Sequence, residues 1–590
     1  MAVDLAELRA RVERWIEEDP DPVTQAELRA LLASSDVAST DLADRFDGAL
    51  EFGTAGLRGV VGAGPNRMNR AVVARATWGL AQELLASVPQ AAKRGVVVGC
   101  DARRMSDEFA DDTASVLAAA GLRVVRFARP VPTPVVSFAV RHLGAAAGVV
   151  ITASHNPREY NGYKVYWENS AQIIPPVDGR IAAAIRRAPP ARAVDAMPAG
   201  AARAAGLLGE AGAEVERAYL EAVERLAVHP SEGRRGLRIV YTPLHGVGDA
   251  FARAALSRAG FAEVSSVPQQ REPDGAFPTV AFPNPEEPGT MDCAFDHARR
   301  TSADLVLAND PDADRLAVAI RKGDTYRQLT GNEVGVLLGH YLLTEGRATR
   351  PRAVVVSLVS SPWLGRIAAE LGAKYEETLT GFKWIANRAI ELEREGYDFV
   401  FGYEEALGYC VGSAVRDKDG ISAALLMAEL AAVLDARGMN LDDRLDAIAR
   451  QWGYFTSGQV NVVRKGAEGA RAIRTMMAEL RAAEGTASVD RLGGAAVVAI
   501  ADYEAGRRAE VGTGRSAPLS LPRSDVLRWD LEGGARVIVR PSGTEPKVKI
   551  YLDVGEVVAP GESVDAAKKR AHGRMAALEQ DVRARFEGPA

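Results

Sequence analysis

The sequence predicts an α/β protein with three related α/β units, each built on a mixed sheet, followed by a smaller C-terminal α+β domain. Three observations lead to this prediction. The chain has 590 residues, which corresponds to roughly four domains of ordinary size. Through most of the chain, short apolar runs alternate with segments of helical periodicity, as in sheets covered by helices. Towards the C-terminus, several apolar runs follow one another between two helical segments.

The first unit contains a β-α-β crossover. The apolar run 96–99 precedes a helical segment at 106–120, and a second apolar run follows at 124–127. Gly121 marks the end of the helix between them. Further elements expected in this unit are helices at 5–18, 24–33 and 71–86, strands at 148–151 and 165–167, and a turn at 161–164.

The later units repeat the order of strand, motif loop and helix without a strict sequence repeat. Strands are expected at 237–240, 303–308, 353–359, 399–401, 495–500, 526–531, 537–540 and 548–552. The segment 186–212 is rich in Ala, Pro, Gly and Arg, so we expect a loose loop at a domain border there. The expected domains are domain I at 1–208, domain II at 209–324, domain III at 325–452 and domain IV at 453–590.

The composition is that of an ordinary soluble globular protein. Hydrophobic residues make up 47% and the net charge is −6, so nothing indicates a nucleic-acid or membrane partner. The cysteines Cys100, Cys293 and Cys410 are too scattered for a disulfide framework, which favours a reducing compartment. The N-terminus lacks the pattern of a signal peptide, and no apolar run is long enough to span a membrane. We therefore expect a cytoplasmic protein.

The segment Thr152–Pro157 places a serine at the end of a strand. It follows the apolar run 148–151, and Asn156 and Pro157 favour a turn directly after Ser154. A serine in this position is either a structural cap or a nucleophile that carries a phosphoryl group. His155 is either a structural hydrogen-bonding residue or part of the same site, and we assign it no catalytic role.

Two basic residues accompany this serine in the first unit. Arg58 lies in the glycine-rich stretch Phe52–Gly59, which is either a hairpin with a solvated arginine or a tight loop that directs the arginine at an anion. Lys164 lies ten residues after Ser154, close enough in sequence to fold back over it.

Three aspartates follow the strand expected at 303–308. Asp310, Asp312 and Asp314 alternate along the chain, so an extended segment would present all three on one side. Crowded carboxylates repel unless a cation neutralises them, and hard oxygen ligands suit Mg²⁺. The alternative is an acidic turn, but the fixed spacing that ends in Arg315 favours a metal site.

The segment Arg540–Lys547 offers donors for an anion. Ser542, Gly543 and Thr544 provide backbone and hydroxyl donors in a tight turn, and the Arg540 guanidinium suits a phosphate group. The alternative is an ordinary hairpin turn, which would not need this combination.

A glycine-bracketed loop carries adjacent carboxylates after the strand at 399–401. Glu404 and Glu405 suit the vicinal hydroxyls of a sugar, although such residues are often plain surface charges. Lys418 lies between two aspartates and is either a solvated turn residue or a proton-transfer group. No Gly-x-x-x-x-Gly-Lys-Ser/Thr nucleotide loop is present. Together these motifs favour a substrate that carries phosphate at either end.

In these motifs and their order the sequence resembles the α-D-phosphohexomutase superfamily, which includes phosphoglucomutase and phosphomannomutase. The matching segments are 152–157, 310–315, 402–408 and 540–544. The resemblance implies four domains around a central cleft, with a C-terminal domain of the TATA-binding-protein-like fold. It also implies a monomer or homodimer that acts on sugar phosphates.

The resemblance further implies a role for each matching residue. Ser154 would be the phosphoserine, and Asp310, Asp312 and Asp314 would hold Mg²⁺ together with a Ser154 phosphate oxygen. Arg58 and Lys164 would lie beside the transferring phosphate, and Lys418 would transfer protons. The substrate would contact Arg315 and Glu404, and its distal phosphate would contact Arg540, Ser542, Gly543 and Thr544.

The implied reaction interconverts the 1-phosphate and 6-phosphate of glucose or mannose through a hexose 1,6-bisphosphate, which also activates the enzyme. One departure concerns the sugar loop, where many members have Gly-Glu-x-Ser-Gly. Here Tyr403 replaces the leading glycine and Ala406 the serine, so a hydroxyl contact is lost. The loop looks most like that of the phosphopentomutase-like branch. Phosphopentomutase and glucose 1,6-bisphosphate synthase are therefore the alternative functions.

Overall fold

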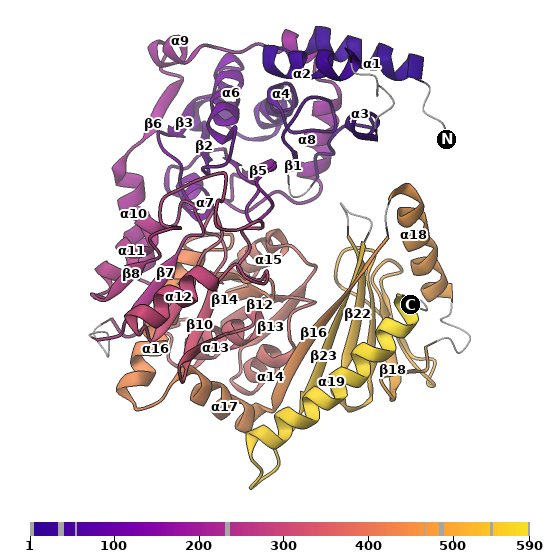
Figure 1. The fold of residues 1–590 in the computed structure, drawn as a ribbon. Helices are drawn as coiled ribbons and strands as arrows, with labels where there is room; N and C mark the ends of the chain where they lie inside the picture. Colours follow the sequence, from indigo (N-terminus) through magenta and orange to yellow (C-terminus); the bar gives the residue numbers. More distant parts are fainter. Residues whose placement is uncertain are drawn as a thin grey trace.

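The computed structural model describes residues 5–33, 40–53, 56–230, 236–464, 466–482, 489–542 and 547–587. Figure 1 shows three sheets covered by helices, followed by an antiparallel sheet at the C-terminus with the long helix α19 (Val564–Phe586) lying along it. The predicted fold class, three α/β units with mixed sheets and a C-terminal α+β domain, is confirmed. Among the described residues, no helix is both long and apolar enough to cross a membrane.

The first sheet has the strand order β1-β5-β4-β2-β3-β6. Strands β4, β2, β3 and β6 are parallel to one another, whereas β5 is antiparallel to both β4 and β1. The strands are β1 (Leu57–Val60), β2 (Val96–Cys100), β3 (Val124–Phe127), β4 (Ala147–Ile151), β5 (Tyr160–Trp167) and β6 (Leu208–Ala211). The helices are α4 (Arg70–Ser87), α5 (Ala91–Arg94), α6 (Ser106–Ala119), α7 (Thr133–His142) and α8 (Val177–Arg186).

The helices α1 (Leu5–Glu18) and α2 (Pro22–Ala33) match the two predicted N-terminal helices. Helix α2 begins two residues earlier than expected because proline is well suited to the first turn of a helix. With the short α3 (Thr40–Arg45), they enclose a small apolar cluster that includes Val12 and Leu28. Arg192 also donates a hydrogen bond to the carbonyl of Asp19, which joins these helices to the rest of domain I.

Two local predictions in domain I are wrong. Residues 161–164 are part of β5 and not a turn, because this segment pairs with β1 on one side and with the end of β4 on the other. A Cβ at Gly162 would lie 2.6 Å from the Thr152 carbonyl oxygen, so the close strand packing needs a glycine here. The segment 186–212 is not a loose loop, since it forms η1 (Ala191–Ala193), α9 (Ala199–Ala204) and β6, which pairs in parallel with β3.

The second and third sheets continue the α/β pattern, in the strand orders β11-β10-β9-β7-β8 and β13-β12-β14-β15. The second unit contains α10 (Ala213–Glu224), β7 (Ile239–Thr242), α11 (Asp249–Arg258), β8 (Val264–Ser266), α12 (Asp292–Thr301), β9 (Leu305–Ala308), β10 (Ala317–Lys322) and β11 (Thr325–Gln328). The third contains α13 (Gly331–Thr344), β12 (Arg352–Ser357), α14 (Trp363–Glu370), β13 (Lys374–Thr378), α15 (Phe382–Arg394), β14 (Asp398–Glu404), β15 (Gly408–Val411), α16 (Gly420–Ala436) and α17 (Leu441–Trp452).

One apolar core runs through the first three units. It joins residues such as Phe127 of domain I, Phe251 of domain II and Leu425 of domain III. Helix α16 is apolar around most of its circumference, which is typical of a fully buried helix. It packs against α10, α11 and α13, so domains II and III close over the same helix.

The last sheet is antiparallel, with the strand order β16-β23-β22-β21-β18-β19-β20. Its apolar face is covered by α18 (Gly466–Ala482) and α19, which enclose a separate core that includes Val537 and Leu552. The strands are β16 (Tyr454–Val463), β17 (Arg491–Leu492), β18 (Ala495–Asp502), β19 (Arg507–Glu510), β20 (Ser516–Pro518), β21 (Leu527–Leu531), β22 (Arg536–Pro541) and β23 (Lys547–Glu556). The 3-10 helix η3 (Glu532–Gly534) connects β21 to β22.

A buried arginine connects this last sheet to the third unit. Arg536 Nε donates to Asp553 Oδ2 at 2.7 Å, and its Nη1 donates to Glu377 Oε1 at 3.2 Å. Its Nη2 donates to the Ser360 carbonyl. The side chains of Arg536 and Asp553 are only 4% and 2% exposed, so neither charge has water as a substitute partner.

Arg536→Met is expected to destabilise the C-terminal domain by about 3–5 kcal/mol, because it leaves the buried Asp553 carboxylate without its cation. Thermal unfolding of the purified variant, followed by circular dichroism and calorimetry, measures this loss. The control is Arg508→Met, which removes an arginine that is 42% exposed and pairs with Asp530 at the surface. Equal loss of stability in the two variants would contradict the assignment of Arg536 as a buried interdomain contact.

Candidate functional site

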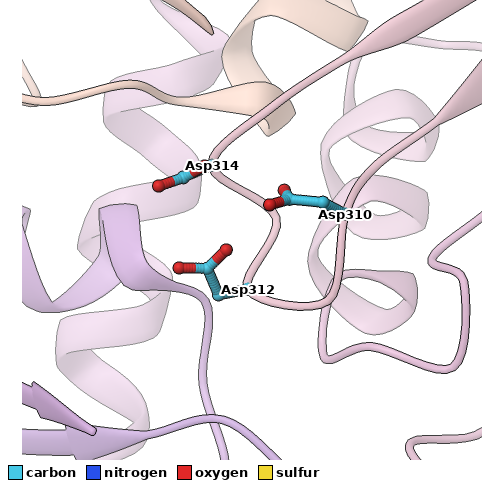
Figure 2. Close-up of side chains that lie close together, drawn as sticks. All are labelled: Asp310, Asp312 and Asp314. Carbon is cyan, nitrogen blue, oxygen red and sulfur yellow. The ribbon is translucent and has the colours of Figure 1, made fainter. Parts of the chain in front are cut away.

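Three aspartate carboxylates converge in the loop between β9 and β10 (Figure 2). Each contributes an oxygen, and these oxygens lie within 4.8 Å of one another with all three side chains fully buried. The expected extended segment is wrong, because the loop turns at Ala313, whose φ is +54°. The Ala313 N–H donates to the Asp310 carbonyl at 2.9 Å. The three carboxylates therefore meet across a turn and not along one side of a strand.

Residues from domains I and III hold this loop in place. Thr133 donates its hydroxyl to Asp312 Oδ2 at 2.7 Å. Lys164 Nζ on β5 lies 2.8 Å from Asp312 Oδ2 and 3.0 Å from Asp314 Oδ2. Lys418 Nζ lies 3.1 Å from the same Asp314 oxygen. The site is thus assembled from all three α/β units.

The three carboxylates differ in their affinity for protons. Burial and the charges of Asp312 and Asp314 raise the pKa of Asp310 well above its usual range. Burial also disfavours the charged forms of Asp312 and Asp314, but neighbouring groups outweigh it, so the pKa of each is lowered. These groups are Lys164 for both carboxylates, the Thr133 hydroxyl for Asp312, and Lys418 and Arg315 for Asp314. A buried carboxylate cluster of this kind gains stability from a further cation beside Asp310.

The donor set fits a metal ion. Asp312 Oδ1 and Asp314 Oδ1 are buried and have no hydrogen-bond partner among the described residues. Three carboxylates give a purely oxygen environment, which suits a hard divalent cation. The aspartate triad therefore has the composition and geometry to hold a metal ion.

Ser154 faces the aspartate triad from the loop after β4. Its Oγ donates to Asp310 Oδ2 at 2.6 Å and lies 3.2 Å from His155 Nδ1. Its backbone has a φ of +52°, and its N–H donates to Thr152 Oγ1 at 2.8 Å. Burial and the charges of Arg315 and Arg58 lower the pKa of His155 well below 6.5, so its imidazole is neutral at neutral pH.

A cavity of about 150 Å³ opens beside Ser154. Gly381 N–H donates to Glu404 Oε1 at 2.7 Å, and Arg58 Nη1 donates to Asn156 Oδ1 at 3.0 Å. Seven of the predicted site residues line this cavity: Arg58, Ser154, Lys164, Asp314, Arg315, Glu404 and Lys418. Arg315 also donates from Nη1 to the Ala406 carbonyl, which connects the metal loop to the predicted sugar loop.

The predicted phosphate clamp lies at the end of β22. Arg540 and Ser542 do not line the cavity. Gly543 and Thr544 lie outside the described residues. The positive charge of Arg540 nevertheless acts on a residue of the cavity wall. Burial, with a contribution from this charge, lowers the pKa of Lys383 to about 8.

Sequence reasoning missed two basic residues near Ser154. Lys383 lines the cavity from the start of α15, and Arg103 lies buried behind the Ser154 loop. Arg103 could have been noticed, since Asp101 and Arg103 follow β2 at the same edge of the sheet where β4 delivers Ser154. Lys383 gave no such signal, because a lysine at a helix start is usually solvated.

Models of four successive domains of the phosphoglucomutase/phosphomannomutase family match this chain. They match α/β/α domains I, II and III at 49–192, 217–323 and 330–451, and the C-terminal domain at 460–556. A probable phosphoribomutase of Schizosaccharomyces pombe is 37% identical over 576 residues, which are 96% of each chain. The chain belongs to the phosphoglucomutase/phosphomannomutase family. The predicted family is therefore confirmed, and so is the predicted enzyme class, an intramolecular phosphotransferase.

Other members of the family are similar over most of their length. Human phosphopentomutase is 35% identical and covers 98% of this chain and 96% of its own. A probable phosphomannomutase of Haemophilus influenzae is 38% identical and covers 82% of this chain and 93% of its own. The open form of Paramecium parafusin, a phosphoglucomutase, has a TM-score of 0.63 at 17% identity, covering 91% of this chain and 96% of its own. That likeness concerns the fold.

Proposed function

We propose that this family member is a phosphosugar mutase that moves a phosphoryl group between C1 and C6 of a hexose, with Ser154 as the covalent carrier. The observation that carries the proposal is the placement of Ser154 Oγ, 2.6 Å from Asp310, on the wall of a cavity that is also lined by five basic side chains: Arg58, Lys164, Arg315, Lys383 and Lys418. A phosphoserine brings about −1.5 to −2 charges at neutral pH, which these cations match.

In each half of the reaction one P–O bond replaces another. A sugar hydroxyl attacks the phosphorus of phosphorylated Ser154, the P–Oγ bond breaks, and a hexose 1,6-bisphosphate forms. The bisphosphate then turns around, and its other phosphoryl group returns to Ser154. Mg²⁺ bound by Asp310, Asp312 and Asp314 would neutralise charge that develops on the transferring oxygens.

The proton must move in the opposite direction to the phosphoryl group. The attacking hydroxyl loses a proton, and the Ser154 oxygen gains one. Burial favours the neutral amine of Lys418, but Asp314 and Asp417 outweigh it and raise its pKa. Lys418 is therefore protonated, and from the cavity wall it gives its proton to Ser154 Oγ and regains one from the sugar hydroxyl.

The remaining residues are assigned to substrate binding. Arg58 and Lys164 would stabilise the transferring phosphate, and Glu404 and Arg315 would bind the sugar. The distal phosphate would bind at the end of β22, to Arg540, Ser542, Gly543 and Thr544. That phosphate site belongs to a domain with its own core, which allows it to accept either phosphate in turn.

A pentose phosphate is the second candidate substrate. Three of the relatives that are named phosphoribomutase or phosphopentomutase match 95% or more of this chain. The loop residue Ala406 also lacks the hydroxyl of the serine that many members of the family have at this position. A third possibility within the family is glucose 1,6-bisphosphate synthesis, in which the bisphosphate is released.

A turnover panel distinguishes these functions. The purified protein is supplied with Mg²⁺, a trace of glucose 1,6-bisphosphate and the 1-phosphates of glucose, mannose, glucosamine, ribose or deoxyribose, and products are followed by ³¹P NMR. We expect isomerised monophosphates, with a hexose among the substrates. A kcat/KM at least about tenfold higher for ribose 1-phosphate, equivalent to about 1.4 kcal/mol, would establish the pentose instead. Accumulating bisphosphate, or no turnover at all, would contradict the mutase assignment.

A further inference from the structure

Arg103 holds the inner side of the Ser154 loop through its guanidinium group. Its Nη2 donates to the carbonyls of Ser154 at 2.6 Å and Asn156 at 2.5 Å. Its Nη1 donates to the carbonyls of Pro157 at 2.8 Å and Tyr160 at 3.2 Å. One planar fork therefore binds three carbonyls of the turn that presents the serine and the first carbonyl of β5, and the Arg103 side chain is only 1% exposed.

A carboxylate fixes the other side of the same turn. Asp101 Oδ2 lies 3.3 Å from Arg103 Nε and accepts a hydrogen bond from Thr152 Oγ1 at 2.6 Å. Thr152 Oγ1 in turn accepts the Ser154 N–H at 2.8 Å. Asp101 thus fixes the Ser154 N–H through Thr152, and Arg103 binds the Ser154 carbonyl directly.

Domain II covers the outer face of this guanidinium. Arg103 Cζ lies 4.9 Å from the centre of the Phe277 ring. The neighbouring Gly275 lies so close that a Cβ there would be 2.5 Å from the Ala102 carbonyl oxygen. Arg103 is therefore enclosed between the Ser154 loop and the domain that carries the three aspartates.

Ser154 needs such support because of its backbone conformation. Its φ of +52° lies in the left-handed region, which is disfavoured for residues with a Cβ unless their surroundings hold them there. This conformation directs Oγ at Asp310. Without the four carbonyl contacts, the turn would be free to relax and Oγ would leave the metal site.

We propose that Arg103 is a positioning residue that keeps the phosphoryl-carrying oxygen of Ser154 against the metal site, an inference that rests on the proposed carrier role of Ser154. Among the described residues, the Arg103 side chain bonds to backbone carbonyls and to Asp101, and it does not line the cavity, so it acts on the reaction through the serine. Its loss should lower kcat and leave substrate binding nearly unchanged.

The test compares Arg103→Met, Arg103→Lys and the control Arg104→Met, which removes the exposed neighbouring arginine. A displacement of about 1 Å can cost about 100-fold in rate, so we expect Arg103→Met to lower kcat about 100-fold. The KM for the sugar phosphate should stay within about threefold of wild type. Arg103→Lys keeps the charge without the planar fork, so it should recover only part of kcat. Arg104→Met should behave as wild type.

Single-turnover phosphorylation by glucose 1,6-bisphosphate, followed by intact mass and peptide mapping, supplies the second readout. We expect the rate of phosphate uptake at Ser154 to fall in parallel with kcat.

A purely structural arginine would lower the melting temperature and the folded fraction but leave kcat per folded molecule unchanged, and that result would overturn the proposal. If Arg103→Met does not fold, a folded Arg103→Lys with wild-type kcat would overturn it equally. Wild-type protein that takes up no phosphate at Ser154 would instead refute the carrier role itself.

Discussion

Ser154→Ala is expected to lower turnover of the preferred sugar phosphate by more than about 10⁴-fold, the scale seen when a covalent nucleophile is removed. No other hydroxyl is placed against Asp310 among the described residues that line the cavity. The fold should survive, because the serine hydroxyl contacts Asp310 and His155 alone among the described residues, while the backbone contacts to Thr152 and Arg103 remain. Steady-state kinetics and peptide mapping after incubation with glucose 1,6-bisphosphate measure both consequences.

Ser170→Ala provides a matched control for this variant. Ser170 is also a buried serine of domain I with a left-handed backbone, with a φ of +62°, and it does not line the cavity. The control should retain wild-type turnover and phosphate uptake at Ser154. Full turnover by Ser154→Ala, or equal losses in the two variants, would refute the covalent role of Ser154.

Removal of divalent cations is expected to abolish turnover, and added Mg²⁺ to restore it. Asp312→Asn should weaken Mg²⁺ binding by at least about 100-fold. Changing a residue that only supports a metal ligand lowers metal affinity about 10–100-fold, and changing a charged ligand itself should cost more. The Oδ1 atom of Asp312 is buried without a partner, so an ion would bind there without displacing a protein contact. Isothermal titration calorimetry measures the binding independently of activity.

Asp324→Asn is the control for the metal experiment, since this exposed aspartate lies in the turn between β10 and β11 of the same sheet. It should bind Mg²⁺ as wild type does. Asp312→Asn with wild-type Mg²⁺ affinity would contradict the assignment of the metal site, and turnover that survives exhaustive chelation would contradict the need for an ion.

The parts of the fold that sequence predicts best are those with strong local signals. Strand β2, helix α6 and strand β3 were expected within one residue or so of their observed ends, because apolar runs and Gly121 mark them clearly. Strand β16 was missed, since most of its side chains are at least partly exposed and only Val460 and Val462 of this strand are buried. This strand is held in place by ten residue pairs with β23, a strand that is distant from it in the sequence.

The candidate site shows the same division between local and distant signals. Ser154 and Asp310 follow buried strands, and the ends of such strands meet at one edge of a sheet, so their positions could be predicted. The convergence of the aspartates depends on the left-handed turn at Ala313, and an alanine in the sequence does not predict such a turn. The role of Arg103 depends on carbonyls more than 50 residues away in the sequence, and no local sequence pattern predicts these contacts.

The shared core of the first three units also has a consequence for the order in which the chain folds during synthesis. Helix α16, residues 420–436, covers α10 and α11, which lie at 213–258. The ribosome makes the intervening segment of about 160 residues at about 5–20 residues per second. Helices α10 and α11 are therefore synthesised roughly 10–30 s before α16, the helix that covers them. During this interval the apolar surface of domain II is exposed, and the nascent chain depends on chaperones or on slow local structure to remain soluble.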